Sequence, residues 1–342
     1  PPPVPIGLPL RWQVKRRSSA SPAENTLIRA TRPQLRIITS VAGLTLLIGG
    51  CGTQSAPEPK TASPRTISPH NIVPQTTPPQ PAAAASPGLQ EPSPEAKQPA
   101  FPGGALVDLT HAFDQNTIFW PTDNQGFRFE RGPFGITERG YFYSANRFAM
   151  AEHGGTHLDA PIHFAEDHPT ADKVPLANLI GPAVLVDVSQ QCRENPDYLI
   201  SVADLRDWEE RHDRTLAETI VLLRTGYYAH WPNRVEYLGT PATGDEAIPN
   251  MHFPGLDPDA ARWLTEHRFI RAVGIDTASI DYGQSRKFES HVALCKHNVP
   301  IFENVANLGD VPETGFNIIA LPMKIAGGSG GPLRIVAVLP QE

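Results

Sequence analysis

The C-terminal part of the chain alternates short apolar runs with amphipathic stretches. The apolar runs have the length and the content of β-branched residues that are typical of buried strands. Helical stretches fit between several of them, so the pattern predicts a mixed α/β domain, and no internal repeat is apparent. The predicted strands are residues 183–188, 220–224, 272–276, 317–322 and 333–339.

Two of the predicted helices have recognisable start signals. Ser201 and Asp204 have the spacing of a capping box, which predicts a helix from Ser201 towards Arg211. Asp257 is a suitable N-terminal cap and Pro258 suits a first helical turn, which predicts a second helix over residues 260–267.

The aromatic residues show where a folded core can begin. No Phe, Trp or Tyr occurs between Trp12 and Phe101. Without large apolar side chains this stretch cannot offset the entropy cost of ordering its backbone. We therefore expect one folded domain over residues 101–342, and a disordered tether rich in Pro, Ala and Ser over residues 52–100.

Residues 1–51 have the pattern of a leader with a lipoprotein signal peptide. An apolar run from Ile37 to Ile48 follows a basic segment and precedes Gly49, Gly50 and Cys51. This arrangement resembles a lipoprotein box, which implies lipidation of Cys51. An uncleaved anchor helix is the alternative. Both interpretations predict export, to the periplasm or the cell surface, and the lipoprotein interpretation also predicts that the lipid is the only contact with the membrane.

Charge and cysteine content exclude two classes of protein. The net charge is -7 and the C-terminal part has no cluster of Lys and Arg, which argues against a nucleic-acid partner. Cys51, Cys192 and Cys295 form no CxxC pair, which argues against a structural zinc finger. A metal ion would therefore be held by histidines and carboxylates. Pairing of Cys192 with Cys295 stays open.

The densest cluster of chemically active residues runs from His153 to His163. An extended chain at residues 157–159 points the His157 imidazole and the Asp159 carboxylate to the same side. Gly154 and Gly155 allow a tight turn that brings His153 back to that side. Pro161 blocks a helix and favours an extended or turning path into His163. Four polar groups can thus converge; the alternative is a set of ordinary surface histidines.

The spacing His-x-Gly-Thr-His-x-Asp-x-Pro-x-His, from His153 to His163, resembles the signature of the cyclase family, which includes bacterial kynurenine formamidases and isatin hydrolases. The resemblance implies that His153, His157 and Asp159 bind zinc or manganese and that His163 is the catalytic histidine. It also implies an α/β fold of the swivelling β/β/α type with a mixed sheet, a metal site at the edge of that sheet, and a homo-oligomer.

The resemblance extends to a second cluster, in which a histidine precedes a Glu-Asn pair by twelve residues. His291 and Glu303, the latter followed by Asn304, have this spacing. Five ligands would then hold one or two Zn²⁺ or Mn²⁺ ions. A separate metal site is the alternative, because His291 and Cys295 share a face of a helix, and Cys295 and His297 share a face of a strand.

Aromatic residues and a glycine-rich loop complete the candidate site. The family places aromatic residues around the substrate, which implies this role for Phe119, Trp120 and Phe164, with ordinary core packing as the alternative. Residues 327–331 resemble a phosphate loop but lead into Pro332 and a strand, so they are expected to form a tight turn or to approach the metal site closely.

These residues predict hydrolysis of a small aryl amide, formamide or lactam. A divalent ion lowers the pKa of a coordinated water to about 7 and polarises a carbonyl. His163 would act as general acid and base, with His111 or His252 as the next candidates. The alternative function is a surface lipoprotein that binds a metal or small ligand without turnover, against which the presence of His163 argues.

Overall fold

The computed structural model describes residues 104–340. The predicted leader, Cys51 and the tether lie outside the described residues. Among residues 104–340, no helix is long and apolar enough to cross a membrane.

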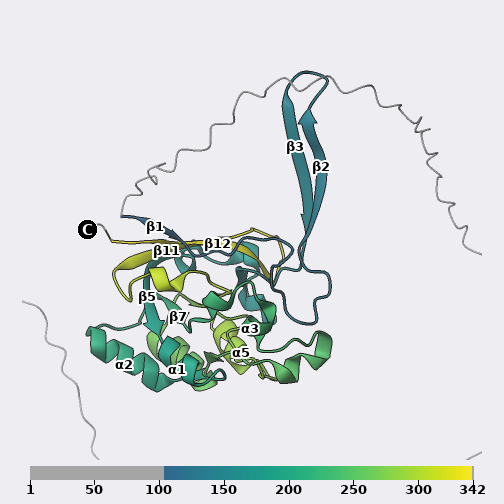
Figure 1. The fold of residues 1–342 in the computed structure, drawn as a ribbon. Coiled ribbons are helices and arrows are strands. Elements are labelled where there is room, and N and C mark those ends of the chain that lie inside the picture. Colours follow the sequence, from purple (N-terminus) through teal and green to yellow (C-terminus); the bar gives the residue numbers. More distant parts are fainter. Residues whose placement is uncertain (1–103, 341–342) are drawn as a thin grey trace, which may run out of the picture. The chain divides into compact units, whose positions relative to one another are not determined.

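A mixed sheet of eight strands forms the centre of the fold (Figure 1). Strands β5, β7, β9 and β10 run parallel, and the remaining neighbours in the sheet pair antiparallel. All five strands predicted from apolar runs are present. In their order across the sheet the strands are β1 (Leu106–Asp108), β12 (Gly330–Val338), β11 (Phe316–Pro322), β5 (Ile180–Asp187), β7 (Ile220–Arg224), β9 (Ala272–Ile275), β10 (Ile301–Glu303) and β4 (His157–Asp159).

Strand β4 closes the sheet into a barrel-like layer. It pairs with β10 on one side and with the first residues of β12 on the other, so that Asp159 faces Ile301 in one strand and Gly330 in the other. The expectation that the metal site lies at the edge of the sheet is therefore wrong. Strand β12 is nine residues long, and its first part reaches β4 while its later part pairs with β11 and β1.

The two faces of the sheet support separate cores. Along β5, Val184 and Val186 belong to one apolar cluster, whereas Ala183 and Leu185 belong to the other. This alternation is the two-residue period of a strand that is buried on both faces. The first cluster contains side chains of three helices, including Trp208, and the helices lie on that side in Figure 1: α2 (Val202–His212), α4 (Pro258–Trp263) and α5 (Glu289–Lys296). The second fills the inside of the closed sheet.

The helices begin at the predicted signals. Ser201 and Asp204 form the capping box of α2, and Asp257 caps α4, which continues into a π-helical turn (Leu264–Arg268). The helices are α1 (Ser189–Glu194), α2 (Val202–His212), α3 (Arg234–Leu238), α4 (Pro258–Trp263) and α5 (Glu289–Lys296). Short 3-10 turns occur at Pro161–His163, Ala171–Lys173, Leu176–Asn178, Tyr227–His230, Gly244–Glu246, Ile248–Asn250 and Leu308–Asp310.

Two smaller sheets accompany the main one. Strands β6 (Leu199–Ile200) and β8 (Gly255–Leu256) form a short parallel pair. Strands β2 (Arg128–Ile136) and β3 (Phe142–Ala149) form an antiparallel hairpin that extends well beyond the main sheet (Figure 1). We call this hairpin the arm. The alternation of apolar and polar residues did not predict it.

Candidate metal and active site

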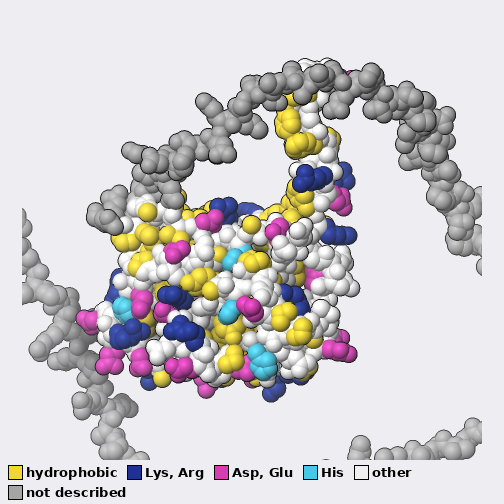
Figure 2. All heavy atoms as spheres, viewed as in Figure 1, with side chains coloured by type: hydrophobic (Ala, Val, Ile, Leu, Met, Phe, Trp, Pro, Cys, Tyr) yellow, Lys and Arg dark blue, Asp and Glu magenta, His cyan; other side chains and the backbone are white. Residues whose placement is uncertain are grey.

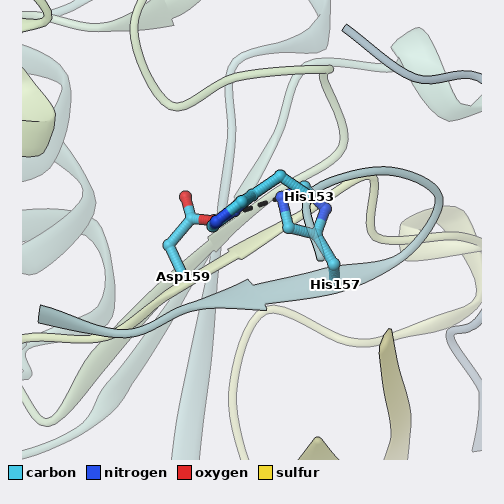
Figure 3. Close-up of side chains that lie close together, drawn as sticks. All are labelled: His153, His157 and Asp159. Carbon is cyan, nitrogen blue, oxygen red and sulfur yellow. Dashed lines mark hydrogen bonds and ion pairs between the residues drawn. The ribbon is translucent and has the colours of Figure 1, made fainter. Parts of the chain in front are cut away.

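Strand β4 sets the geometry of the first ligand group. Residues His157 and Asp159 point to the same side, as an extended chain requires, and the preceding turn brings His153 to them (Figure 3). Gly155 has a φ of +58°, a value that favours glycine. A Cβ on Gly154 would overlap the ring of Phe119. Both glycines of the turn are therefore required by its shape.

The first group converges on one oxygen of Asp159. His153 Nδ1 lies 2.6 Å from Asp159 Oδ1, and His157 Nε2 lies 3.2 Å from the same oxygen. The predicted convergence of these three side chains is present in the fold. His163 comes from the 3-10 turn that follows β4, and Pro161 occupies the start of that turn. The predicted turning path from Pro161 into His163 is therefore present, because this element is a single turn with proline at its start.

Helix α5 and strand β10 bring the second group to the other oxygen of Asp159. His291 Nε2 lies 3.2 Å from Asp159 Oδ2 and 3.1 Å from Glu303 Oε1. Because β10 pairs with β4, Glu303 stands opposite His157, and its Oε2 lies 3.5 Å from His157 Nε2. All five predicted ligands are thus adjacent, and Asp159 belongs to both groups that have the spacing for an ion.

The outer nitrogen of each buried imidazole has a fixed hydrogen-bond partner. His157 Nδ1 lies 2.9 Å from the carbonyl oxygen of Gly155, to which it donates. His291 Nδ1 lies 2.6 Å from Asp281 Oδ2. In the neutral rings the inner Nε2 atoms then have lone pairs that face carboxylate oxygens, and this arrangement needs either a proton or a cation between them.

His153 has a comparable arrangement. The hydroxyl of Ser329 donates to Glu152 at 2.7 Å and so accepts from His153 Nε2 at 2.8 Å, which leaves Nδ1 facing Asp159. Three imidazole nitrogens and two carboxylates are therefore directed at one region. This donor set, rich in His and carboxylate and free of thiolate, fits a divalent cation such as Zn²⁺ or Mn²⁺.

The protonation of the cluster reflects the same crowding. Burial lowers the pKa of His157, but the charges of Asp159 and Glu303 and the hydrogen bonds to Asp159 and Gly155 together outweigh it and raise the pKa to about 9. Burial likewise opposes protonation of His291, yet its hydrogen bonds to Asp159, Asp281 and Glu303 raise its pKa well above the usual value. Burial and the neighbouring Asp159 raise the pKa of Glu303. Without a bound ion, protons on His157 and His291 supply the positive charge that balances the carboxylates.

Three supporting residues were missed by the sequence interpretation. Asp281 accepts from His291 and also from the backbone N–H groups of Ser290 and His291, which fixes the start of α5. No motif marks Asp281, because its partner lies ten residues away in a separate element. Ser329 and Glu152 lie beside recognised motifs, and a Cβ on Gly330 would overlap the His153 ring, so the glycine-rich loop does approach the site closely.

His163 differs from the other three histidines. Its ring stacks on His153 at 3.8 Å between centroids. Among the described residues, no protein hydrogen bond engages the His163 ring, and neither ligand group includes it. Burial lowers the pKa of His163 to about 4, so the ring is neutral at neutral pH and available to accept a proton.

A pocket of about 280 Å³ opens above the cluster, and its walls are mainly apolar. Phe119, Trp120 and Phe164 line it, where the sequence analysis expected them. Phe288 also lines it, and its ring lies 6.1 Å from Trp120 and 5.4 Å from Phe164. The remaining lining residues are Ile118, His153, Gly154, His157, Asp159, His163, Ala278, Ser279, His291, Glu303 and Asn304.

The alternative metal site around Cys295 is not formed. Cys295 lies on α5 with His291 but is buried in the helix-side core, where desolvation raises the pKa of its thiol to about 12. His297 is exposed and its ring bonds the carbonyl oxygen of Ala293. Cys192 and Cys295 are both free thiols, so they do not pair.

His111 and His252, the next candidates for proton transfer, do not line the pocket. His111 stacks on Trp231 with 4.2 Å between ring centroids, and burial lowers its pKa to about 4. His252 bonds Asp197 at 2.8 Å on an exposed surface. Neither residue replaces His163 beside the five-residue cluster.

Comparisons with known proteins agree with this site. The family model described as "Putative cyclase" matches residues 107–282. An isatin hydrolase of Roseibium aggregatum is 30% identical over 210 residues, covering 59% of this chain and 77% of that protein. A kynurenine formamidase of Erythrobacter litoralis is 29% identical over 231 residues, covering 68% of this chain and 92% of that protein.

Solved structures with a similar fold include an isatin hydrolase bound to the product analogue thioisatinate, at a TM-score of 0.63 and 28% identity, over 69% of this chain and 92% of that chain. Isatin hydrolase A from Labrenzia aggregata, bound to benzyl benzoate, gives a TM-score of 0.62 and 32% identity, over 69% of this chain and 94% of that chain. The isatin hydrolase and kynurenine formamidase relatives are consistent with this match. Because the family model spans more than half of the 342 residues and the fold agrees, the chain belongs to the cyclase family of metal-dependent hydrolases.

Proposed function

We propose that this chain hydrolyses a small aryl amide, formamide or lactam with the help of one or two Zn²⁺ or Mn²⁺ ions. His153, His157, Asp159, His291 and Glu303 would hold the ions, and His163 would move protons. The observation that carries this proposal is the convergence of the His157 and His291 Nε2 atoms on the carboxylates of Asp159 and Glu303 at the floor of the pocket. Buried imidazoles and carboxylates that converge in this way are typical of ligands to a divalent ion.

When bound, a divalent ion supplies Lewis acidity, which lowers the pKa of water and polarises a carbonyl group. The chain's own residues supply orientation. Asp281 and the Gly155 carbonyl hold His291 and His157 in the tautomer whose inner nitrogen points to the ligand region. Such outer partners fix both the ring angle and the basicity of a ligand histidine.

Proton transfer is assigned to His163. Its neutral ring can accept a proton from water and deliver it to the nitrogen that leaves when the amide bond breaks. Its stacking on His153 keeps the ring at the wall of the pocket, next to the ligand group. Phe164 packs against its edge at 4.5 Å between centroids and limits the positions the ring can take.

The pocket supports an aromatic substrate. Phe119, Trp120, Phe164 and Phe288 give it flat apolar walls, and its volume suits one small molecule. The relatives named isatin hydrolase and kynurenine formamidase support the same choice. The second candidate, a lipoprotein that binds without turnover, is disfavoured by His163, because a binding site has no need of an unengaged histidine at this place.

The test uses the full chain. Metal analysis of the purified protein should find Zn or Mn at up to two ions per chain, and a screen of isatin, N-formylkynurenine and simple lactams should find turnover that a chelator abolishes. Bound metal with no turnover on any amide or lactam would favour the binding function. Absence of metal, and failure of added Zn²⁺ or Mn²⁺ to bind, would contradict both.

We also propose that Cys51 is lipidated and that the protein is exported and held to the membrane by that lipid. The apolar run from Ile37 to Ile48 before Gly49, Gly50 and Cys51 supports this. Blocking lipoprotein processing with globomycin should leave a larger precursor. A mature protein that still contains residues before Cys51 would contradict the proposal.

A further inference from the structure

A second cavity lies at the carboxyl ends of β5 and β7, two neighbouring parallel strands of the main sheet (Figure 1). Asp187 ends β5 and stands opposite Arg224, which ends β7. We call this space the β5–β7 cavity. Its volume of about 580 Å³ lies within the roughly 300–1,000 Å³ of small-molecule pockets. Ligands of α/β sheets commonly bind beyond the carboxyl ends of parallel strands, so both its size and its place suit a ligand site.

The wall of the β5–β7 cavity carries basic groups. Arg193, Arg224 and His230 line it, and no Asp or Glu is among the described residues that do so. Glu236 lies 3.4 Å from the His230 ring, but it is exposed and outside the lining. The chain as a whole has a net charge of -7, and acidic side chains lie among the basic ones over the body in Figure 2. A basic cavity in such a molecule favours an anion.

Two carboxylates lie near this wall, and the protein itself engages both. Asp187 Oδ2 accepts from Arg224 Nη1 at 3.1 Å, and its Oδ1 accepts from the backbone N–H of Ser189 at 2.9 Å. The fully buried Asp276 accepts three hydrogen bonds from the turn at residues 225–226, which lines the cavity. Asp276 therefore fixes the shape of the cavity wall, and Asp187 fixes one end of the Arg224 guanidinium.

Arg224 has a hydrogen-bonding edge that the protein leaves free. Within residues 104–340 its guanidinium has one partner, Asp187, which contacts Nη1. Nε is buried and has no hydrogen-bond partner there. Nε and Nη2 form the side edge of the group, whose two parallel N–H bonds match the two oxygens of a carboxylate or phosphate. Native structures rarely leave a buried donor without an acceptor, so this edge is suited to an oxyanion from outside the chain.

Arg193 supplies a second guanidinium. It lies on α1, one turn after Ser189, and is exposed. The hydroxyl of Ser189, 3.4 Å from Nη1, is the one hydrogen-bond partner of this guanidinium in the described part of the chain. Both arginines of the wall thus have donors that no protein group uses, and an oxyanion in the cavity can accept from both.

The β5–β7 cavity also has apolar surface. Tyr227, Tyr228, Cys192 and Pro196 line it beside the basic groups. Burial raises the pKa of the Cys192 thiol far above the neutral range, so Cys192 is a small apolar group here and not a nucleophile. A ligand that combines an anionic head with a small apolar body matches this wall better than a bare ion does.

We propose that the β5–β7 cavity binds a small organic anion, whose carboxylate or phosphate group is held by Arg224 and Arg193. The apolar body of the ligand lies against Tyr227 and Tyr228. This cavity shares no lining residue with the pocket above the metal-ligand cluster, so the two can be occupied together. The proposal does not depend on hydrolysis of an amide.

Titration calorimetry of the full chain, in a mild detergent, tests the proposal with benzoate, phenyl phosphate and inorganic phosphate. At least one of the two organic anions should bind, and inorganic phosphate should bind more weakly. Arg224→Ala should weaken binding by about 10–100-fold, because a charge-assisted pair of hydrogen bonds is lost. Arg224→Lys keeps the charge but lacks the paired N–H groups, so it should restore only part of the affinity.

The matched control is Arg214→Ala, which removes an exposed arginine outside the cavity and should leave binding unchanged. Equal circular dichroism and equal metal content in all variants exclude misfolding. The absence of binding by both organic anions would overturn the proposal. Equal binding by Arg224→Ala and the unaltered chain would also overturn it, because the anion then binds elsewhere. Inorganic phosphate that binds as tightly as phenyl phosphate would overturn the role of the apolar wall.

Modification of arginine by phenylglyoxal locates the ligand without any variant. Mass spectrometry of the peptides gives the rate at which each arginine reacts. A saturating concentration of the bound anion should slow the reaction of Arg193 and Arg224 and leave that of Arg214 unchanged. Equal rates at Arg193 and Arg224 with and without the anion would overturn their assignment as its ligands.

Discussion

The cluster around Asp159 and the arm differ in how many contact partners their side chains have within the chain. In the cluster every ligand residue is held by at least two neighbouring residues, and both oxygens of Asp159 are occupied. In the arm the large side chains contact mainly one another, as in the edge-to-face pair of Phe134 and Phe142 at 5.2 Å. The partners of the cluster lie within one chain, whereas the large apolar side chains of the arm are more than half exposed.

This difference predicts where changes act. A substitution in the cluster leaves several buried groups without partners, so it should change metal binding, protonation and fold stability together. A substitution in the arm leaves the body's interior contacts as they were.

Asp159→Ala should abolish both metal binding and turnover. Asp159 belongs to both possible ligand groups, so its loss removes the common partner of His153, His157 and His291. We expect metal affinity to fall by more than about 100-fold, the upper range for losing a residue that only supports a ligand. Metal analysis and turnover measure this, with the exposed Asp245→Ala as control. Full metal content in Asp159→Ala would refute its assignment as a ligand.

The His163→Ala variant should keep its bound metal, but its turnover rate should fall. Only proton transfer is removed, which costs about 10²–10⁴-fold in turnover. The control is His168→Ala, a partly exposed histidine that bonds Asn298 and lies outside the ligand groups. If His163→Ala loses metal as completely as Asp159→Ala, His163 is a ligand and the mechanism is wrong. If it keeps full activity, the proton comes from another group.

Phe302→Ala should destabilise the fold by about 3–5 kcal/mol, because it empties a fully buried site on β10 beside β4. Tyr143→Ala, at a half-exposed position of the arm, should stay within about 0.5 kcal/mol. Urea unfolding followed by tryptophan fluorescence compares the two. A similar loss in both variants would mean that the arm is part of the cooperative core.

Metal affinity should rise with pH up to about 9. The pKa of His157 is raised to about 9 in the metal-free cluster, so an ion must displace its proton, and affinity gains roughly tenfold per pH unit for each proton released. The same raised pKa stabilises the metal-free fold below pH 6.5, and that stability is lost as pH rises through 9. Calorimetry in two buffers of different ionisation heat counts the protons. Affinity independent of pH would contradict this scheme.

The features that local sequence patterns predicted correctly are those that depend on neighbouring residues alone. The buried strands, the capping box at Ser201 and the shared face of His157 and Asp159 depend on a few neighbouring residues, and all are present. The second group, His291 and Glu303, came from family resemblance, because no local rule joins residues more than a hundred positions from Asp159. Their meeting depends on the pairing of β10 with β4.

The failures also have physical causes. Closure of the sheet depends on how far β12 extends, which its composition does not encode. Asp281 is bonded through the tertiary fold and has no motif. The arm was missed because the bulge at Gly132 and Pro133 breaks its alternation, and because proline within a run argues against a strand.

The same bulge affects the solubility of the protein. A two-stranded ribbon has two free edges, and rows of unpaired N–H and C=O groups next to aromatic residues promote the edge-to-edge growth seen in aggregates. Pro133 lacks an N–H, and the bulge twists the outer edge of β2, while Arg128, Glu130 and Arg131 add charge along it. The edge of the arm therefore resists the addition of further strands, although its large apolar side chains are exposed.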